Sequence, residues 1–281
     1  MVHIVTDTTS CLPPEVAEQY DIPVIPQVIH LGEETYAEGR DLTLEQFLDY
    51  LVSHRGLPKT SAPPPAWFVP VFQRLTATGE PVLCIHPSTD LSGTVRSATV
   101  AAQDFPDADI RVLDTRLIAV SLGKVVELAA QWAAQGMDAD TLEQRVMDMA
   151  RRNRLYFVVD TLDYLAQGGR IGKAAHLLGT ALRIKPILAL EDGVIVAHHK
   201  ERTLRRALDY LTRTVVAEYP RQGEGHLQVM HAAVPERAQA LAERLAAELG
   251  LEEVPIAPLP PAIITHAGPG ALAVSFFRDA A

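Results

Sequence analysis

The stretch "PVLCIHPSTDLSGTVRSATVAAQDF", residues 81–105, contains one complete pattern of strand, loop and helix. An apolar run ends at His86, small hydroxyl residues follow it, and alanine and valine then recur with the period of a helix. The same alternation begins with "HIVTD" at 3–7 and with "IPVIPQVIHL" at 22–31, which reads as one strand, and it continues with "IRVLD" at 110–114. Repeated units of this kind predict an α/β fold with a mostly parallel sheet flanked by helices.

The second half of the chain predicts another α/β domain, with a mixed sheet. "LYFVVD" opens a new series of strand patterns, and Asp192-Gly193 separates "KPILAL" from "VIVAHH" in the way the tight turn of a β-hairpin does. "AIITHAGPGALAVSFF" at 262–277 reads as a pair of strands. We therefore expect an N-terminal domain at 1–153 and a C-terminal domain at 154–281.

Helix ends are also marked locally. Thr43 and Gln46 have the spacing of a capping box, in which each side chain bonds to the backbone N–H of the other residue. Gly136 ends the long helical pattern "GKVVELAAQWAAQ", and a proline at 64 or 65 suits the first turn of the next helix after "KTSA".

Composition limits the classes of protein that this chain can belong to. The 281 residues carry a net charge of −10, which argues against a nucleic-acid partner because phosphates require a concentrated basic surface. The two cysteines, Cys11 and Cys84, are too few for a disulfide framework and lack the spacing of a metal site. We expect no metal, no signal peptide, no membrane span and at most a transient contact with a membrane surface. The expected location is the cytoplasm.

Two clusters of hydroxyl side chains predict a site for an anion. Ser88, Thr89 and Ser92 lie where a strand ends and a helix begins, and Thr60 and Ser61 precede a second helix. Ligands of open α/β sheets bind beyond the carboxyl ends of the strands, and the free N–H groups of a helix start favour negative charge. The alternative is that individual hydroxyls only cap the helices.

The segment "TLDYLAQGGRIGKAAHLLGTALRIKPIL" at 161–188 carries the most specific pattern. Gly168-Gly169 ends a helix and leaves Arg170 in the following turn, where its guanidinium can bind a carboxylate or phosphate with two donors. The helix expected next is apolar on nearly all sides. Such a helix is either buried in the core or lines an apolar cavity.

His266 is a weaker candidate for the same site. It is followed by Gly268 and Gly270 directly after an expected strand, and glycines allow a ligand to approach the backbone closely. A lone histidine can equally be structural. The phosphate-binding motifs G-x-x-x-x-G-K-[ST] and G-x-G-x-x-G do not occur, and neither does the G-x-S-x-G motif of hydrolases.

Taken together, the motifs resemble those of the DegV family of bacterial fatty-acid-binding proteins. "VTDTTSCLP", "KTSAPP", "STDLSGTVRSA", the segment around Arg170, "EDGVI" with "KERT", and "THAGPGAL" follow each other in the family order over nearly the whole chain. The resemblance implies two α/β domains, a bound fatty acid with its carboxylate in a polar site between the domains, and an apolar tunnel for its tail. It also implies a lipid-binding carrier rather than an enzyme, with no cofactor. The implied partner is a fatty acid kinase that forms an acyl phosphate for phospholipid synthesis.

The resemblance also assigns residues to these roles. The head group would be held by Thr60, by Ser88 or Thr89, by Arg170 and by His266, with Ser61 and Ser92 beside them. The tunnel would be lined by apolar residues of the segment around Arg170, namely Ile171, Leu177, Leu178, Leu182 and Ile187. The family usually has serine where this chain has Thr89, so the added methyl narrows the head-group site.

The same residues also fit two alternative functions. In the first, Ser88 or Thr89 is activated by His266 as the nucleophile of an acyl hydrolase, and an aspartate orients the imidazole. Asp7, Asp90 and Asp114 are the candidates for that aspartate. In the second, the chain carries another apolar carboxylate, such as an isoprenoid acid.

Overall fold

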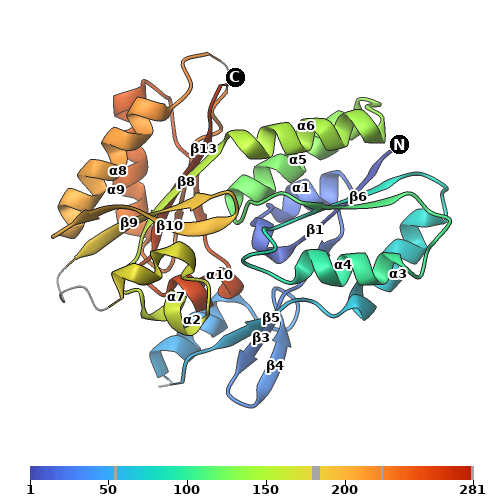
Figure 1. Cartoon of the computed structure of the whole chain (residues 1–281), viewed down its shortest axis with the longest axis horizontal. Coiled ribbons are helices and arrows are strands. Elements are labelled where there is room, and N and C mark those ends of the chain that lie inside the picture. Colours follow the sequence, from blue (N-terminus) through green and yellow to red (C-terminus); the bar gives the residue numbers. More distant parts are fainter. Residues whose placement is uncertain (54–55, 179–183, 223, 280–281) are drawn as a thin grey trace. The chain divides into compact units, whose positions relative to one another are not determined.

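A computed structural model describes residues 1–53, 56–178, 184–222 and 224–279. The chain divides into two compact units, Met1–Arg151 and Arg152–Ala281, which we call unit 1 and unit 2. Each unit has its own sheet with helices packed against it (Figure 1). The predicted domains at 1–153 and 154–281 stay a prediction about segments that fold independently.

Unit 1 is built on a parallel sheet of four strands, as the repeated strand and helix pattern predicts. The strands lie in the order β2-β1-β6-β7. Every neighbouring pair is parallel, so all carboxyl ends meet at one edge of the sheet. The strand bounds are His3–Asp7 for β1, Val24–Ile25 for β2, Val82–His86 for β6 and Ile110–Asp114 for β7.

Helices cover both faces of this sheet. Figure 1 shows α5 and α6 on one side of it and α3 and α4 on the other. Phe68 and Phe72 of α3 are completely buried and pack with Cys84 of β6 and Ala98 of α4. Leu142, Val146 and Met149 form the buried stripe of α6. The helices of unit 1 are α1 Pro14–Gln19, α2 Leu44–Ser53, α3 Pro65–Thr76, α4 Thr94–Ala102, α5 Val120–Ala134 and α6 Ala139–Arg152, with a 3-10 turn, η1, at Thr8–Ser10.

A second, antiparallel sheet in unit 1 was not expected from the sequence. The stretch 22–31 predicts one strand, but it forms two, β2 and β3 (Val28–Leu31), which join different sheets. Pro26 stands between them and has no backbone N–H to donate to a ladder. Strand β3 pairs with β4 (Glu34–Ala37) on one side and with β5 (Lys59–Ser61) on the other.

The predicted capping box is confirmed at the start of α2. The backbone N–H of Thr43 donates to Oε1 of Gln46 at 2.9 Å, and the N–H of Gln46 donates to Oγ1 of Thr43 at 3.2 Å. The helix after "KTSA" begins at Pro65, and the helix before Gly136 ends at Ala134. These three helix ends follow from local sequence signals.

Unit 2 is built on a mixed sheet of six strands, in the order β10-β9-β8-β13-β11-β12. The predicted hairpin is confirmed between β9 and β10, and Asp192 and Gly193 in its turn have φ angles of 48° and 77°. Only the pair β11 and β12 is parallel among these neighbours. The bounds are β8 Asn153–Val158, β9 Lys185–Glu191, β10 Val194–Glu201, β11 Gln228–His231, β12 Ile256–Pro258 and β13 Leu272–Phe277.

Two helices, α8 (Leu204–Glu218) and α9 (Pro235–Leu249), lie along the sheet of unit 2, where Figure 1 shows them side by side. Leu211 and Val215 of α8 and Leu241 and Leu245 of α9 are buried in one core with the apolar side chains of β11 and β13. The short helices of unit 2 are α7 Asp163–Gln167, a 3-10 helix η2 at Gly172–Leu177, and α10 Pro261–Ala267.

Two elements of unit 2 differ from the sequence prediction. The first half of the expected strand pair at 262–277 is the helix α10, because Pro261 occupies its first turn and Oγ1 of Thr265 donates to the carbonyl of Pro261 at 2.9 Å. Of the apolar helix expected after Arg170, the described part is a 3-10 helix at 172–177. Gly172 begins it with a φ of 55°, a value that an α-helix does not allow. Residues 179–183 lie outside the described part.

Within the described ranges, no helix combines the length and apolar character that crossing a bilayer requires. The same residues contain no group of three or more histidine, cysteine, aspartate or glutamate side chains arranged to hold a metal ion.

Candidate functional site

Polar residues gather at the carboxyl edge of the parallel sheet in unit 1. Strand β1 ends at Asp7, β6 ends at His86 and β7 ends at Asp114. The loop after β6 carries the predicted residues Ser88 and Ser92. Because the strands are parallel, these groups meet at the edge where ligands of open α/β sheets bind.

The centre of this edge is Asp7, which is completely buried. Its Oδ1 accepts from the N–H and the hydroxyl of Thr9, at 3.0 and 2.6 Å, and from Nε2 of Gln27 at 3.0 Å. Its Oδ2 lies 2.7 Å from Nδ1 of His86, which is also completely buried. A buried carboxylate needs this many donors to replace the water it has lost.

The loop that begins α4 is connected to Asp7 through Gln27. Nε2 of Gln27 also donates to Oγ1 of Thr94, at 2.9 Å. The Thr94 hydroxyl lies 2.8 Å from Oγ of Ser92, and the N–H of Thr94 donates to the same Ser92 oxygen at 3.3 Å. Ser92 is half-buried, whereas Gln27 and Thr94 are buried. These contacts join Asp7, Gln27, Thr94 and Ser92 into one chain of hydrogen bonds.

The structure distinguishes between Ser88 and Thr89. Ser88 is completely buried, and its Oγ accepts from the N–H of Asp90 at 3.2 Å. Thr89 is exposed, and its hydroxyl donates to Oδ2 of Asp114 at 2.6 Å. The one proton of Thr89 is therefore already bound to a carboxylate of the protein.

Thr60 and Ser61 are neighbours on β5 and point to opposite faces of that strand. Oγ of Ser61 is bonded to Nε2 of His30 at 2.9 Å. The turn after β5 comes close to the loop before α4, since a Cβ added to Gly93 would lie 3.3 Å from Cβ of Ala62. The Thr60 segment and the Ser92 segment are thus packed together.

Arg170 of unit 2 lies where the sequence predicts, in the turn after α7. Gly168 follows the last residue of α7, and Gly169 adopts a φ of 70°. The backbone N–H of Arg170 donates to the carbonyl of Leu165 at 2.9 Å, and Nη1 of its guanidinium donates to the carbonyl of Gly168 at 2.6 Å. These bonds fix the backbone of Arg170 and one side of its guanidinium.

His266 lies in the last turn of α10, not directly after a strand as the sequence pattern indicates. The imidazole packs on Gly168, where an added Cβ would lie 2.2 Å from Nδ1 of His266. Burial, and secondly the nearby charge of Arg170, lower the pKa of His266 to about 4. The site in unit 2 therefore combines a fixed cation with an imidazole that is neutral at pH 7.

The predicted tunnel residues have different environments. Ile171 and Leu177 are buried at the two ends of η2, and Ile187 is buried against Val158 and Ala207 of the sheet and α8. Leu178 is 44% exposed. Leu182 lies outside the described residues. A role of these side chains around an alkyl chain stays a prediction.

The residue before α5 has a strained backbone. Ala119 has a φ of 59° and a ψ of −147°, a region that only glycine adopts easily. Its N–H donates to the carbonyl of Thr9 at 2.9 Å, and the N–H of Ser88 donates to the nearby carbonyl of Leu117 at 2.9 Å. The loop before α5, which contains Ala119, is therefore bonded to the loops after β1 and β6.

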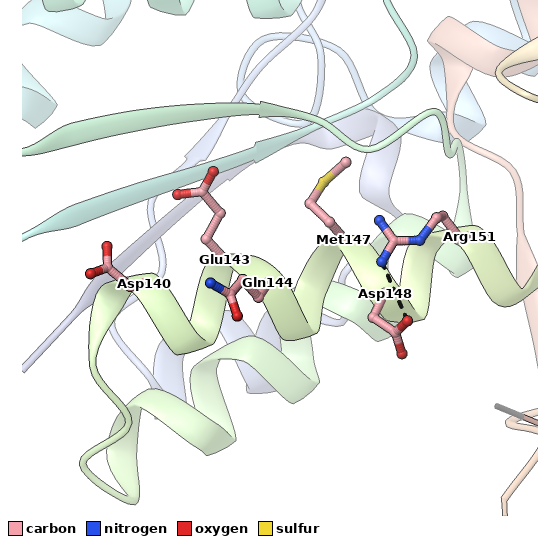
Figure 2. Close-up of a pocket in the computed structure, with 6 residues that line it drawn as sticks. All are labelled: Asp140, Glu143, Gln144, Met147, Asp148 and Arg151. Carbon is pink, nitrogen blue, oxygen red and sulfur yellow. Dashed lines mark hydrogen bonds and ion pairs between the residues drawn. The ribbon is translucent and has the colours of Figure 1, made fainter. Parts of the chain in front are cut away.

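A hollow on the outer surface of α6 is a poor candidate for a fatty acid. Figure 2 shows its lining, in which an ion pair of 3.3 Å joins Arg151 to Asp148. Asp140 and Glu143 of the same lining bond to Arg111 at 2.6 and 3.3 Å. Met147 is the only apolar side chain among the six that line it. Such a surface repels an anion and gives an alkyl chain no apolar wall.

Sequence reasoning missed the buried part of this site. Gln27 has no local pattern that indicates its contact with Thr94, 67 positions later. Asp7 is a candidate in the sequence only as the partner of a catalytic histidine. In the structure it orients His86 instead.

The fold defines the class: a protein of two α/β units, one built on a parallel sheet and the other on a mixed sheet. The chain belongs to the DegV family. A family model described as "Uncharacterised protein, DegV family" matches residues 1–279.

Known relatives match over nearly their full length. The chain is 37% identical to a DegV domain-containing protein of Streptomyces coelicolor, with 97% of each chain covered. It is similar to the crystal structure of a fatty acid binding DegV family protein from Streptococcus agalactiae, with a TM-score of 0.91, 29% identity and 99% of each chain covered. It is also similar to that of DegV, a fatty acid binding protein from Bacillus subtilis, with a TM-score of 0.89 and 30% identity over 98% of this chain and 99% of the other.

Proposed function

We propose that this chain binds a long-chain fatty acid and holds its carboxylate with Arg170 and a set of neutral donors. The observation that carries the proposal is the pair in unit 2, a fixed guanidinium next to the imidazole of His266, whose pKa is lowered to about 4. One cation balances one carboxylate, and a neutral imidazole adds a donor without a second charge. The fatty-acid-binding relatives named above support the proposal.

The alkyl tail supplies most of the affinity in this proposal. Each buried methylene contributes about 0.8 kcal/mol, so a chain of a dozen or so carbons outweighs the net gain from a few hydrogen bonds. The head-group donors then determine which end of the ligand enters and which chemical group it carries. Ile171, Leu177, Leu178, Leu182 and Ile187 are the proposed contacts of the tail.

The proposed head-group donors form one set in each unit. In unit 2 they are Arg170 and His266, and in unit 1 they are Thr60, Ser88 and Ser92. Thr89 is left out because its proton is bonded to Asp114, and Ser61 because its hydroxyl is paired with His30. Thr89 is bonded to a carboxylate rather than to an imidazole, so its contacts give the hydrolase alternative no support.

We further propose that the chain presents the bound acid to a fatty acid kinase in the cytoplasm. The product of the kinase would be used for phospholipid synthesis. The kinase would transfer the terminal phosphoryl group of ATP to a carboxylate oxygen, which forms an acyl phosphate and ADP. The carrier itself needs no catalytic residue for this step. A radiolabelled ATP assay with a bacterial fatty acid kinase tests it: labelled acyl phosphate that depends on this chain supports the partner, and its absence contradicts it.

Displacement of a fluorescent fatty acid tests the binding function. Palmitic acid should displace the probe more strongly than its methyl ester, because the ester has no negative charge to pair with Arg170. Arg170→Met should reduce the preference for the acid by about tenfold, the value of one charge-assisted contact. Arg244→Met is the matched control, since Arg244 forms a surface ion pair with Asp209 on α8. Equal binding of acid and ester by the unmodified protein would contradict the proposal.

A further inference from the structure

The orientation of the Gln27 side chain is fixed by its charged neighbour. Its amide group faces Oδ1 of Asp7 at 3.0 Å and Oγ1 of Thr94 at 2.9 Å with the same atom, Nε2. An amide oxygen in that position would face a carboxylate oxygen, which is repulsive. Both amide protons of Gln27 are therefore donated, one to Asp7 and the other to Thr94.

This orientation determines the role of the Thr94 hydroxyl. Thr94 is completely buried, and its Oγ1 accepts from Gln27, so its own proton needs another acceptor. The acceptor that the described contacts provide is Oγ of Ser92, at 2.8 Å. Leaving the proton unpaired would cost the full penalty of a buried donor. Thr94 is thus the donor in its bond with Ser92.

Ser92 is the last member of the chain and is left with one function. Its oxygen accepts from the hydroxyl of Thr94 at 2.8 Å and from the N–H of Thr94 at 3.3 Å, which uses both lone pairs. Its own proton has no acceptor among the described residues, and the side chain is half-buried rather than enclosed. A ligand at Ser92 therefore meets a donor and no acceptor.

We propose that Gln27 is a positioning residue that, through Thr94, fixes the Ser92 hydroxyl as a donor to the carboxylate of the bound fatty acid. The inference rests on the proposed function and adds a source of selectivity for the ionised head group. Thr94 accepts a bond from Gln27 and Ser92 accepts two from Thr94, which polarises the terminal O–H and strengthens its bond to an anion. A fatty alcohol, which needs an acceptor for its own proton, finds none at Ser92.

The inner end of the chain is rigid, which a positioning role requires. Asp7 is held by Thr9 and by His86, and the backbone N–H of Gln27 donates to Oγ1 of Thr8 at 3.0 Å. The backbone carbonyl of Gln27 accepts from the N–H of Glu38 at 2.9 Å. The Gln27 amide therefore has both its backbone and its side chain fixed.

The test compares the affinities of the full chain for palmitic acid and for hexadecanol, which have the same tail. Thr94→Val removes the hydroxyl but keeps the shape, and it should lower the preference for the acid by about fivefold. Gln27→Met should lower the preference for the acid by a similar factor. Thr94→Ser keeps the hydroxyl and should keep the preference of the unmodified protein. The matched control is Thr212→Val, which removes a buried hydroxyl bonded to the carbonyl of Leu208 within α8. It should leave the preference unchanged.

A double-mutant cycle shows whether the effect passes through Ser92. Thr94→Val should have no further effect on the preference in a Ser92→Ala background. An unchanged preference in Thr94→Val and Gln27→Met, or an effect of Thr94→Val that persists without Ser92, would overturn the inference while leaving fatty acid binding intact. If the unmodified protein bound neither ligand, the proposed function itself would fail.

Infrared spectra of bound acid labelled with 13C in its carboxyl group give a second readout in the conservative variant Gln27→Asn. The carboxylate band should shift there, and an unshifted band would overturn the inference.

Discussion

Gly168 lies so close to His266 that a single added carbon would occupy the position of the imidazole, with Cβ 2.2 Å from Nδ1. The φ of Gly168 is −74°, so the backbone itself would accept alanine. Gly168→Ala should therefore act by displacing His266. We expect a loss of about 1–3 kcal/mol in the free energy of unfolding, typical of overpacking, and weaker binding of fatty acid.

Gly169→Ala is the matched control for that substitution. Gly169 has a φ of 70° and no atom within 4 Å of an added Cβ, so alanine there strains only the backbone. It should cost about 1 kcal/mol in urea unfolding and leave the NMR signals of His266 in place. Movement of the His266 signals in Gly169→Ala, but not in Gly168→Ala, would contradict the packing described here.

The pKa of His266, lowered to about 4 first by burial and then by the charge of Arg170, makes folding depend on pH. Between pH 6.5 and pH 4 the unfolded chain binds a proton that the folded chain does not bind. The free energy of unfolding should therefore be highest above pH 6.5, as far as His266 determines it. It should fall by about 2–3 kcal/mol as the pH decreases to 4. His266→Gln should flatten this part of the curve measured by urea unfolding, and an unchanged slope would contradict the assignment.

The same pKa responds to Arg170. Replacing Arg170 by glutamine removes the second cause of the shift but leaves burial, which is the larger one. We expect the pKa of His266, followed by NMR titration, to rise while staying below its ordinary value of 6.5. A decrease would show that Arg170 does not act on the imidazole by charge.

Ala119 offers a stabilising substitution. Its φ of 59° and ψ of −147° are strained for alanine and relaxed for glycine. Ala119→Gly should raise the free energy of unfolding by about 1 kcal/mol despite the greater flexibility of the unfolded chain. Ala130→Gly, inside α5, is the control and should lower it by about 1 kcal/mol. Destabilisation of similar size at both positions would contradict the backbone conformation of Ala119.

Local chemistry made much of the fold predictable from the sequence. The hairpin turn at Asp192-Gly193 and the capping box of Thr43 with Gln46 depend on residues that are adjacent or one helical turn apart. The parallel sheet of unit 1 follows from the repeated alternation of apolar runs and helical patterns. In each case the interacting groups are close in sequence, so the pattern contains the cause.

The sequence prediction was wrong where a weak local preference competed with a stronger constraint, local in one case and tertiary in the other. The β-branched residues Ile263, Ile264 and Thr265 suggest a strand, but Pro261 favours the first turn of a helix, and α10 forms. Position 172, where η2 begins, has room only for glycine because a Cβ there would lie 2.5 Å from the carbonyl oxygen of Ile195 on β10. That constraint comes from the tertiary structure and leaves only the glycine itself as a sign in the sequence.

The candidate site was predictable only in part. Arg170 could be placed because the glycines before it end a helix, and the hydroxyl residues could be placed because they follow a strand. The network of Asp7, Gln27 and Thr94 could not, because its members lie on three segments of unit 1 that are far apart in the sequence.

The most direct test of the account is to identify the lipid that the chain carries when it is purified. Native mass spectrometry of the intact protein, followed by analysis of the ligand released on denaturation, gives both stoichiometry and chemical identity. We predict one long-chain fatty acid per chain, with less of it retained by Arg170→Met than by Arg244→Met. A protein that carries no lipid after expression in fatty-acid-supplemented cells, or that carries a ligand without a carboxylate, would contradict the central claim.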